Sequence, residues 1–123
     1  MTDTDISWLA GFLEGEGTFG LRNKTTLYVS ATSTDRDVLD RVRKITGSGC
    51  IYSITKRKSH WKDAWVWTVT CSGAQQIMIA VLPKMGKRRS GKIMSLLDIQ
   101  AAQTAIKIEL YKGILERRRR VKE

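Results

Sequence analysis

Residues 8–17 have the sequence Trp8-Leu9-Ala10-Gly11-Phe12-Leu13-Glu14-Gly15-Glu16-Gly17. Apolar side chains at positions 6, 9, 10 and 13 repeat at i, i+3, i+4 and i+7. This spacing is typical of an amphipathic helix with one buried face. We expect a helix from about Asp5 to Gly15, with Thr4 or Asp5 as its N-cap.

Two glycines interrupt the good helix formers of this segment. Gly11 and Gly15 lie four residues apart on one helical face, and each costs about 1 kcal/mol relative to Ala in a helix interior. Small residues at this spacing let a second helix approach closely. The pattern favours a homodimer around a twofold axis, with Trp8 and Phe12 beside the glycines in the interface. Alternatively, the glycines pack against the chain's own sheet.

Glu16 lies at the end of the same helix, where its charge is unfavourable. It meets the negative end of the helix dipole and carbonyl oxygens without intrahelical partners, and a second Glu16 across a twofold axis would add repulsion. A divalent cation relieves all three effects. The Glu16 carboxylate and the Gly15 carbonyl are hard oxygen ligands that suit Mg²⁺. Paired Mg²⁺-bound carboxylates beside a polyanion are typical of two-metal phosphodiester hydrolases.

The charge distribution indicates a polyanionic partner. The 123 residues carry a net charge of +10, with −4 over residues 1–40 and +14 over residues 41–123. This asymmetry favours nucleic acid over an acidic small molecule, and a membrane surface is the rival partner. There is no run of 18 apolar residues and no basic stretch among the first 15 residues. We therefore expect an intracellular protein, cytoplasmic or organellar, that is neither membrane-spanning nor secreted.

Cysteine and histidine are scarce. Cys50 and Cys71 lack CxxC spacing, and His60 is the single histidine, so a zinc site is not expected. We expect two buried thiols in preference to a disulfide.

The rest of the chain alternates hairpins and helices. The pattern predicts strands at Thr18–Lys24 and Thr26–Thr34, a helix from a capping box at Thr34 to Gly47, strands at Cys50–Thr55 and Ala64–Cys71, a helix opened by Ser72 and closed by Pro83, and one or two helices over Ser90–Leu115. Two hairpins predict an antiparallel sheet with helices on one face, an α+β fold. The length suits one domain over residues 1–123.

Alternation in the first hairpin separates two faces. Phe19, Leu21, Val29 and Ala31 would face the helices. The opposite face is polar and basic, and we expect it to contact the DNA major groove or, alternatively, only solvent. Its predicted DNA contacts are Arg22, Lys24, Tyr28, Ser30 and Thr32.

Three further basic segments are candidate contacts to phosphates or bases. They are the loop Lys56-Arg57-Lys58, the run Lys87-Arg88-Arg89, and the run Arg117–Arg120, which could equally be a solvated tail. In the second hairpin, alternation does not decide whether Tyr52, Ile54, Trp65 and Trp67 face the core or the groove.

The string LAGFLEGEG at 9–17 resembles the LAGLIDADG motif of homing endonucleases. Leu9, Ala10, Gly11 and Gly17 are identical, and Glu14 and Glu16 stand where the motif has its two Asp residues. The order of elements and the segment 82–89 also fall where that family has counterparts. The resemblance implies an αββαββα fold with a saddle-shaped antiparallel sheet and motif helices at the subunit interface.

The same resemblance implies roles for particular residues. Glu16 would be the metal ligand, Glu14 structural, and either Lys87 or Arg88 the basic residue near the cleavage centre. Ser33 stands where the family often has Gln. The implied protein is a homodimeric, Mg²⁺-dependent endonuclease that cuts both strands of a long, nearly palindromic DNA site. The alternative is a relative without cleavage activity that acts as a DNA-binding regulator or as an RNA-splicing maturase.

Overall fold

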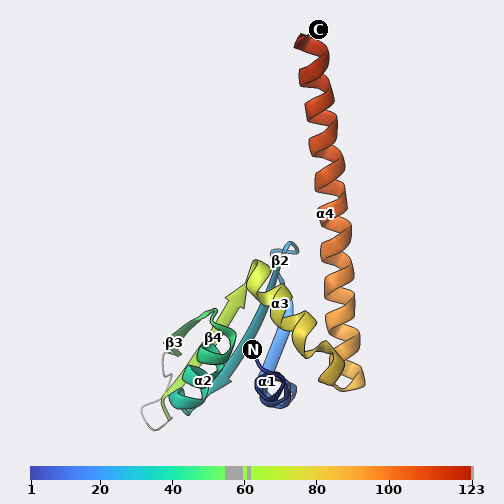
Figure 1. Cartoon of the computed structure of the whole chain (residues 1–123). Coiled ribbons are helices and arrows are strands. Elements are labelled where there is room, and N and C mark those ends of the chain that lie inside the picture. The colour runs from blue at the N-terminus through green and yellow to red at the C-terminus, as the bar shows by residue number, and fades with distance from the viewer. Residues whose placement is uncertain (55–59, 61, 123) are drawn as a thin grey trace.

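The computed structural model describes residues 1–54, 60 and 62–122 of the chain (Figure 1). Its elements are α1 (Asp3–Glu16), β1 (Gly17–Arg22), β2 (Thr26–Ser33), α2 (Arg36–Thr46), β3 (Cys50–Ile54), β4 (Ala64–Thr70), α3 (Cys71–Val81), a 3₁₀ turn (Leu82–Lys84) and α4 (Lys87–Lys122). The predicted order of two αββ units followed by further helices is confirmed.

Helix α1 begins earlier than its apolar stripe. Thr2 is the N-cap: its Oγ1 accepts from the Asp5 N–H at 3.0 Å, and the Asp5 carboxylate accepts from the Thr2 N–H at 3.2 Å. The prediction of Thr4 or Asp5 as N-cap is wrong because Asp5 occupies the third helical position of a capping box. Leu9, Ala10 and Leu13 are buried, as the stripe predicts.

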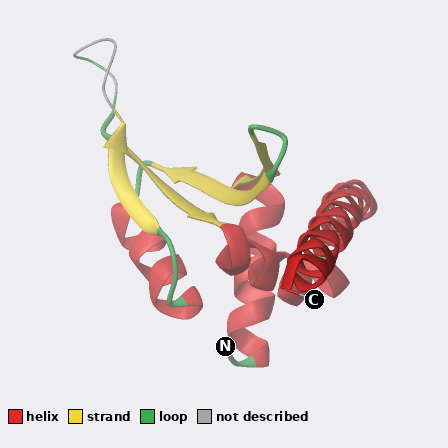
Figure 2. Cartoon of the chain, turned by 90° about the horizontal axis from the view of Figure 1, so that it is seen from above, coloured by secondary structure: helices red, strands yellow, loops and turns green. Residues whose placement is uncertain are grey.

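The four strands form one antiparallel sheet in the order β1-β2-β4-β3. The first hairpin closes through Asn23 and Lys24, whose φ angles of 51° and 64° are both positive. Two left-handed residues give the turn the twist that matches its flanking strands. In Figure 2 the helices lie on one side of the curved sheet and the opposite face is uncovered.

The core lies between the sheet and the helices. Leu27, Val29 and Ala31 of β2 are buried, and so is Trp67 of β4, which pairs with Ala31. The Trp67 indole donates to the Ser48 carbonyl at 2.9 Å. Trp65 shares the helix-facing side with Trp67, because the two residues are separated by one position of the strand.

The pairing of β3 with β4 decides which side chains of the second hairpin face the helices. Tyr52 and Ile54 point to the uncovered face and remain 50% and 42% exposed.

Two helix starts and both cysteines differ from the predictions. Helix α2 begins after Asp35 without a side-chain cap, so the expected Thr34 capping box is wrong; Ser33 Oγ accepts the Asp35 N–H at 3.0 Å just before the helix. Helix α3 begins at Cys71, directly after β4, and not at Ser72. Cys50 and Cys71 are free thiols as expected, but both are exposed, so their predicted burial is wrong.

Helix α4 is one continuous element of 36 residues, about 54 Å long at 1.5 Å per residue. Its first turns join the core through Ile93 and Leu96. Farther along, Gln103 donates to the Lys24 carbonyl at 2.8 Å, and the helix then continues away from the sheet (Figure 1). Within residues 1–54, 60 and 62–122, no helix is long and apolar enough to cross a membrane.

Candidate metal centre and nucleic-acid interface

Glu16 is exposed at the junction between α1 and β1. The helix ends there because Gly17 adopts an extended backbone, with φ of −81° and ψ of 151°, while its N–H still donates to the Leu13 carbonyl; a Cβ on Gly17 would lie 2.6 Å from that oxygen. The last turn of α1 contains no Lys or Arg. Among the described residues, no hydrogen bond or ion pair engages the Glu16 carboxylate. Because this negative charge at the carboxyl end of a helix is uncompensated, the position favours a cation.

The oxygen atoms around Glu16 fit a hard metal ion. Carbonyls of the last helical turn, Gly15 included, lack intrahelical partners, and carboxylate and carbonyl oxygens are ligands that Mg²⁺ accepts. In the described part of one chain, no three His, Cys, Asp or Glu side chains group as metal ligands. One copy thus offers a single carboxylate and its neighbouring carbonyl.

Glu14 has a different environment from Glu16. Its carboxylate accepts the Gly86 N–H at 3.3 Å, and a Cβ on Gly86 would lie 2.8 Å from the other carboxylate oxygen. This contact ties α1 to the segment before α4, which gives Glu14 a structural role.

The glycine face of α1 is open. A Cβ on Gly11 or Gly15 would meet no described atom within 4 Å, so the alternative that these glycines pack against the chain's own sheet is wrong. Beside them, the rings of Trp8 and Phe12 stack with centroids 5.6 Å apart. The result is an open, partly apolar surface on α1, with the Arg41 guanidinium 4.1 Å from the centroid of the Trp8 ring.

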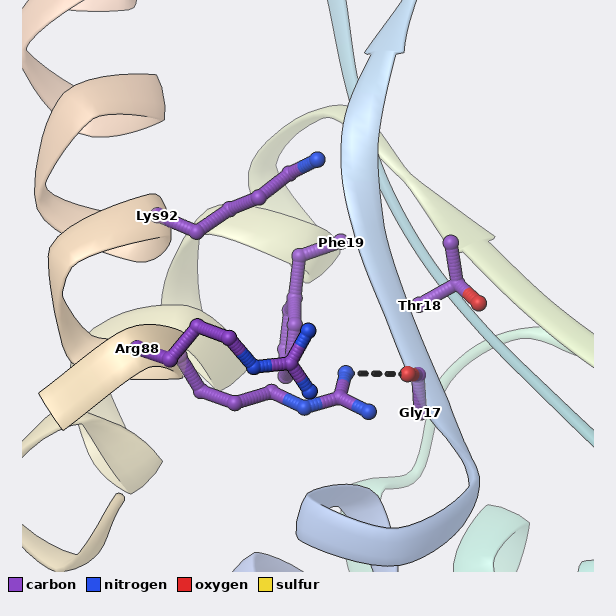
Figure 3. Close-up of a pocket in the computed structure, with 6 residues that line it drawn as sticks. Gly17, Thr18, Phe19, Arg88 and Lys92 are labelled. Carbon is purple, nitrogen blue, oxygen red and sulfur yellow. Dashed lines mark hydrogen bonds between the residues drawn. The ribbon is translucent and has the colours of Figure 1, made fainter. Parts of the chain in front are cut away.

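The start of α4 comes close to the end of α1. Lys87 and Arg88 are exposed there. Arg89 turns inward: its guanidinium donates to the Gly17 carbonyl (Figure 3) and lies 5.9 Å from the centroid of the Phe19 ring. Arg89 therefore holds the junction that carries Glu16, and its contact with DNA stays a prediction.

The uncovered face of the first hairpin carries most of the predicted contacts. Arg22 and Thr32 are exposed, and Tyr28 and Ser30 are half-buried. The Tyr28 ring covers Gly20, where a Cβ would lie 2.7 Å from the ring, and the Arg22 guanidinium lies 5.1 Å from the ring centroid. Lys24 is exposed in the turn. The structure thus brings four of these five residues onto one face and the fifth to its tip.

The second hairpin adds residues that the sequence did not assign. The Tyr52 hydroxyl lies 3.5 Å from Thr68 Oγ1 on the same uncovered face. Only the pairing of β3 with β4 places Tyr52 and Thr68 on this face, because alternation in the sequence does not decide which face of the second hairpin is covered. The predicted contacts Lys56, Arg57 and Lys58 lie outside the described residues.

Comparison with known proteins identifies the family of the chain. A family model for LAGLIDADG-like domains matches residues 3–79. The chain belongs to the LAGLIDADG family. No curated protein matches this family member in sequence.

Two solved structures share the LAGLIDADG fold with this chain. The archaeal intron-encoded homing endonuclease I-Vdi141I, complexed with DNA, matches with a TM-score of 0.62 and 17% identity, over 84% of this chain and 70% of that one. The group I intron-encoded homing endonuclease I-CeuI, also complexed with DNA, matches with a TM-score of 0.56 and 20% identity, over 88% of this chain and 60% of that one.

Proposed function

We propose that this chain forms a homodimeric, Mg²⁺-dependent endonuclease that cuts both strands of a long, nearly palindromic DNA site. The observation that carries the proposal is Glu16: an exposed, uncompensated carboxylate at the end of α1, next to the open glycine face. The catalytic unit would span residues 1–123, whereas the family model matches residues 3–79.

The dimer would form through α1. The open surface at Gly11 and Gly15 allows a second α1 to approach, and the stacked rings of Trp8 and Phe12 supply apolar area at its edge. A twofold axis through this face places equivalent residues of the two copies near each other. The two Glu16 carboxylates would then contribute to one centre.

Glu16 and Gly15 of each copy would hold the metal. Bound Mg²⁺ would supply an activated water and stabilise the leaving oxygen of the phosphodiester. Arg88 and Lys87 remain the candidates for contact with the scissile phosphate. Arg88 lines a hollow together with Gly17, the residue after Glu16, whereas Lys87 does not line it.

The uncovered sheet face would bind the DNA. It presents Arg22, Tyr28, Ser30 and Thr32 away from the helices, and a two-stranded ribbon fits the major groove. The net charge of +10 favours the same partner through contacts to phosphates.

One observation favours the binding alternative, a regulator or an RNA-splicing maturase that has lost cleavage. Ser33 stands where the family often has Gln, and its hydroxyl accepts the Asp35 N–H at 3.0 Å. The Ser33 hydroxyl is therefore engaged in a local turn, and it is shorter than the Gln side chain that the family often has at this position.

A library of genomic and randomised duplexes, offered to the purified protein with Mg²⁺, Ca²⁺ or EDTA, tests the proposal. We expect retention in Ca²⁺ and cutting of both strands in Mg²⁺. Glu16→Gln should lower cutting by about 100-fold or more, because charge stabilisation in the transition state is lost, while duplex affinity stays largely intact.

Glu109→Gln is the matched control, since Glu109 is an exposed acid on the distant part of α4. Retention without cutting in Mg²⁺ would favour the binding alternative. Unchanged cutting by Glu16→Gln would show that the metal is held elsewhere.

A further inference from the structure

A cationic hollow lies between β1 and the first two turns of α4. Its volume is about 200 Å³, room for several waters at about 30 Å³ each. It is lined by Gly17, Thr18, Phe19, Arg88, Arg89 and Lys92. Figure 3 shows the side chains of Arg88 and Lys92 extending from α4 towards β1.

Three positive side chains share this space, and no acidic residue lines it. Arg88 and Lys92 lie one helical turn apart, so their side chains project from the same face. Among the described residues, neither has a hydrogen-bond or ion-pair partner. Like charges gathered in one hollow repel one another, so the arrangement is unfavourable until an anion enters.

Two further features add to the positive field of the hollow. Arg89 lines it as a third cation, with its guanidinium held by the Gly17 carbonyl. The first turn of α4 also contains no acidic residue, and the positive end of its dipole adds to the field of Lys87 and Arg88.

We propose that this hollow is an anion site that takes a backbone phosphate of the nucleic acid, with Arg88 and Lys92 as its ligands. Lys92, which no sequence pattern singled out, is the new residue of the site; its spacing of four from Arg88 is the signal that could have found it. Gly17, which directly follows Glu16 in the chain, lines the hollow. The identification of the anion as DNA rests on the proposed function, whereas the anion site rests on the geometry.

The salt dependence of duplex affinity, measured in EDTA, tests the site. Each lost phosphate contact lowers the slope of log K against log[salt] by about 0.9. Because both side chains hold one phosphate, we expect Arg88→Gln with Lys92→Gln to lower the slope by about 1. Lys44→Gln is the matched control, because Lys44 is an exposed cation on α2, on the covered side of the sheet, and its slope should match the wild type.

Titration with inorganic phosphate separates the possible sources of the anion. In the wild type, amide NMR shifts should move at Gly17, Thr18 and Phe19, and the double variant should lose this response. Lys92→Arg keeps the positive charge, so it should retain the salt slope and the phosphate-induced shifts of the wild type. This result would show that the double variant loses both because of its charges. Shifts with phosphate but an unchanged slope with duplex would restrict the site to free phosphate and overturn the nucleic-acid assignment.

No response in either measurement would overturn the site itself. If the double variant changes the salt slope but the wild-type protein does not cut DNA, the anion site is supported and the nuclease proposal is rejected.

Discussion

The end of α1 and the start of α4 carry opposite charges, and both contradict the dipoles of their helices. Glu16 lies at a negative helix end, whereas Lys87, Arg88 and Arg89 lie at a positive one. The other end of α1, by contrast, carries Asp3 and Asp5 in its first turn. Helix α2 likewise has Asp37 in its first turn and Arg43 and Lys44 in its last.

The two exceptions occur at one place in the fold. Arg89 donates to the Gly17 carbonyl, and Glu14 accepts the Gly86 N–H. Each of these charges is unfavourable for its own helix, and the fold brings the two helix ends to one junction. The two ends also differ: Glu16 has no protein partner in the described structure, whereas one of the three bases is tied into the fold.

The largest expected effect is on DNA cutting, from substitutions that separate the two subunits of the proposed dimer and leave each subunit folded. Gly11→Val or Gly15→Val should convert a dimer to a monomer in sedimentation and lower DNA cutting by about 100-fold or more, because one copy lacks the second carboxylate. The monomer should still fold, since a Cβ at either glycine has open space and Val has a higher helix propensity than Gly.

Gly113→Val is the control for these variants, as another helical glycine whose Cβ would have open space. A wild-type protein that already sediments as a monomer would contradict the dimer.

A smaller effect should separate the two glutamates of α1. Glu14→Ala should lower the free energy of unfolding in urea by about 1 kcal/mol, because it leaves the Gly86 N–H without its partner. Glu16→Ala should not lower it. Equal losses from the two substitutions would mean that Glu16 also contributes to stability and that another group compensates its charge.

The smallest effects test the helix dipoles directly. Glu16→Lys and Lys87→Glu should each raise the free energy of unfolding by about 0.3 to 1 kcal/mol at low salt, since each puts a favourable charge at a helix end. Thermal unfolding at two salt concentrations measures this gain and its screening. A loss of stability in both variants would show that the two ends compensate each other in the free protein.

Much of the fold was predictable because its signals are local. The stripe over positions 6–13 predicts α1, and alternation in 18–34 predicts which side chains of the first hairpin face the helices. Gly47, with φ of 64°, ends α2 as expected. Each of these patterns depends on neighbours within a few residues, where helical and strand periodicities act.

The tertiary structure decided what depends on residues far apart in the chain. Strand pairing placed Trp67 in the core and Tyr52 on the uncovered face, which alternation alone does not distinguish. Arg89 meets Gly17 across 72 residues, and Glu14 meets Gly86 across the same separation. Contacts between residues so far apart in the sequence leave no periodic pattern along the chain. The sequence alone therefore determined the motif that carries Glu16, whereas only tertiary packing brought the start of α4 beside it.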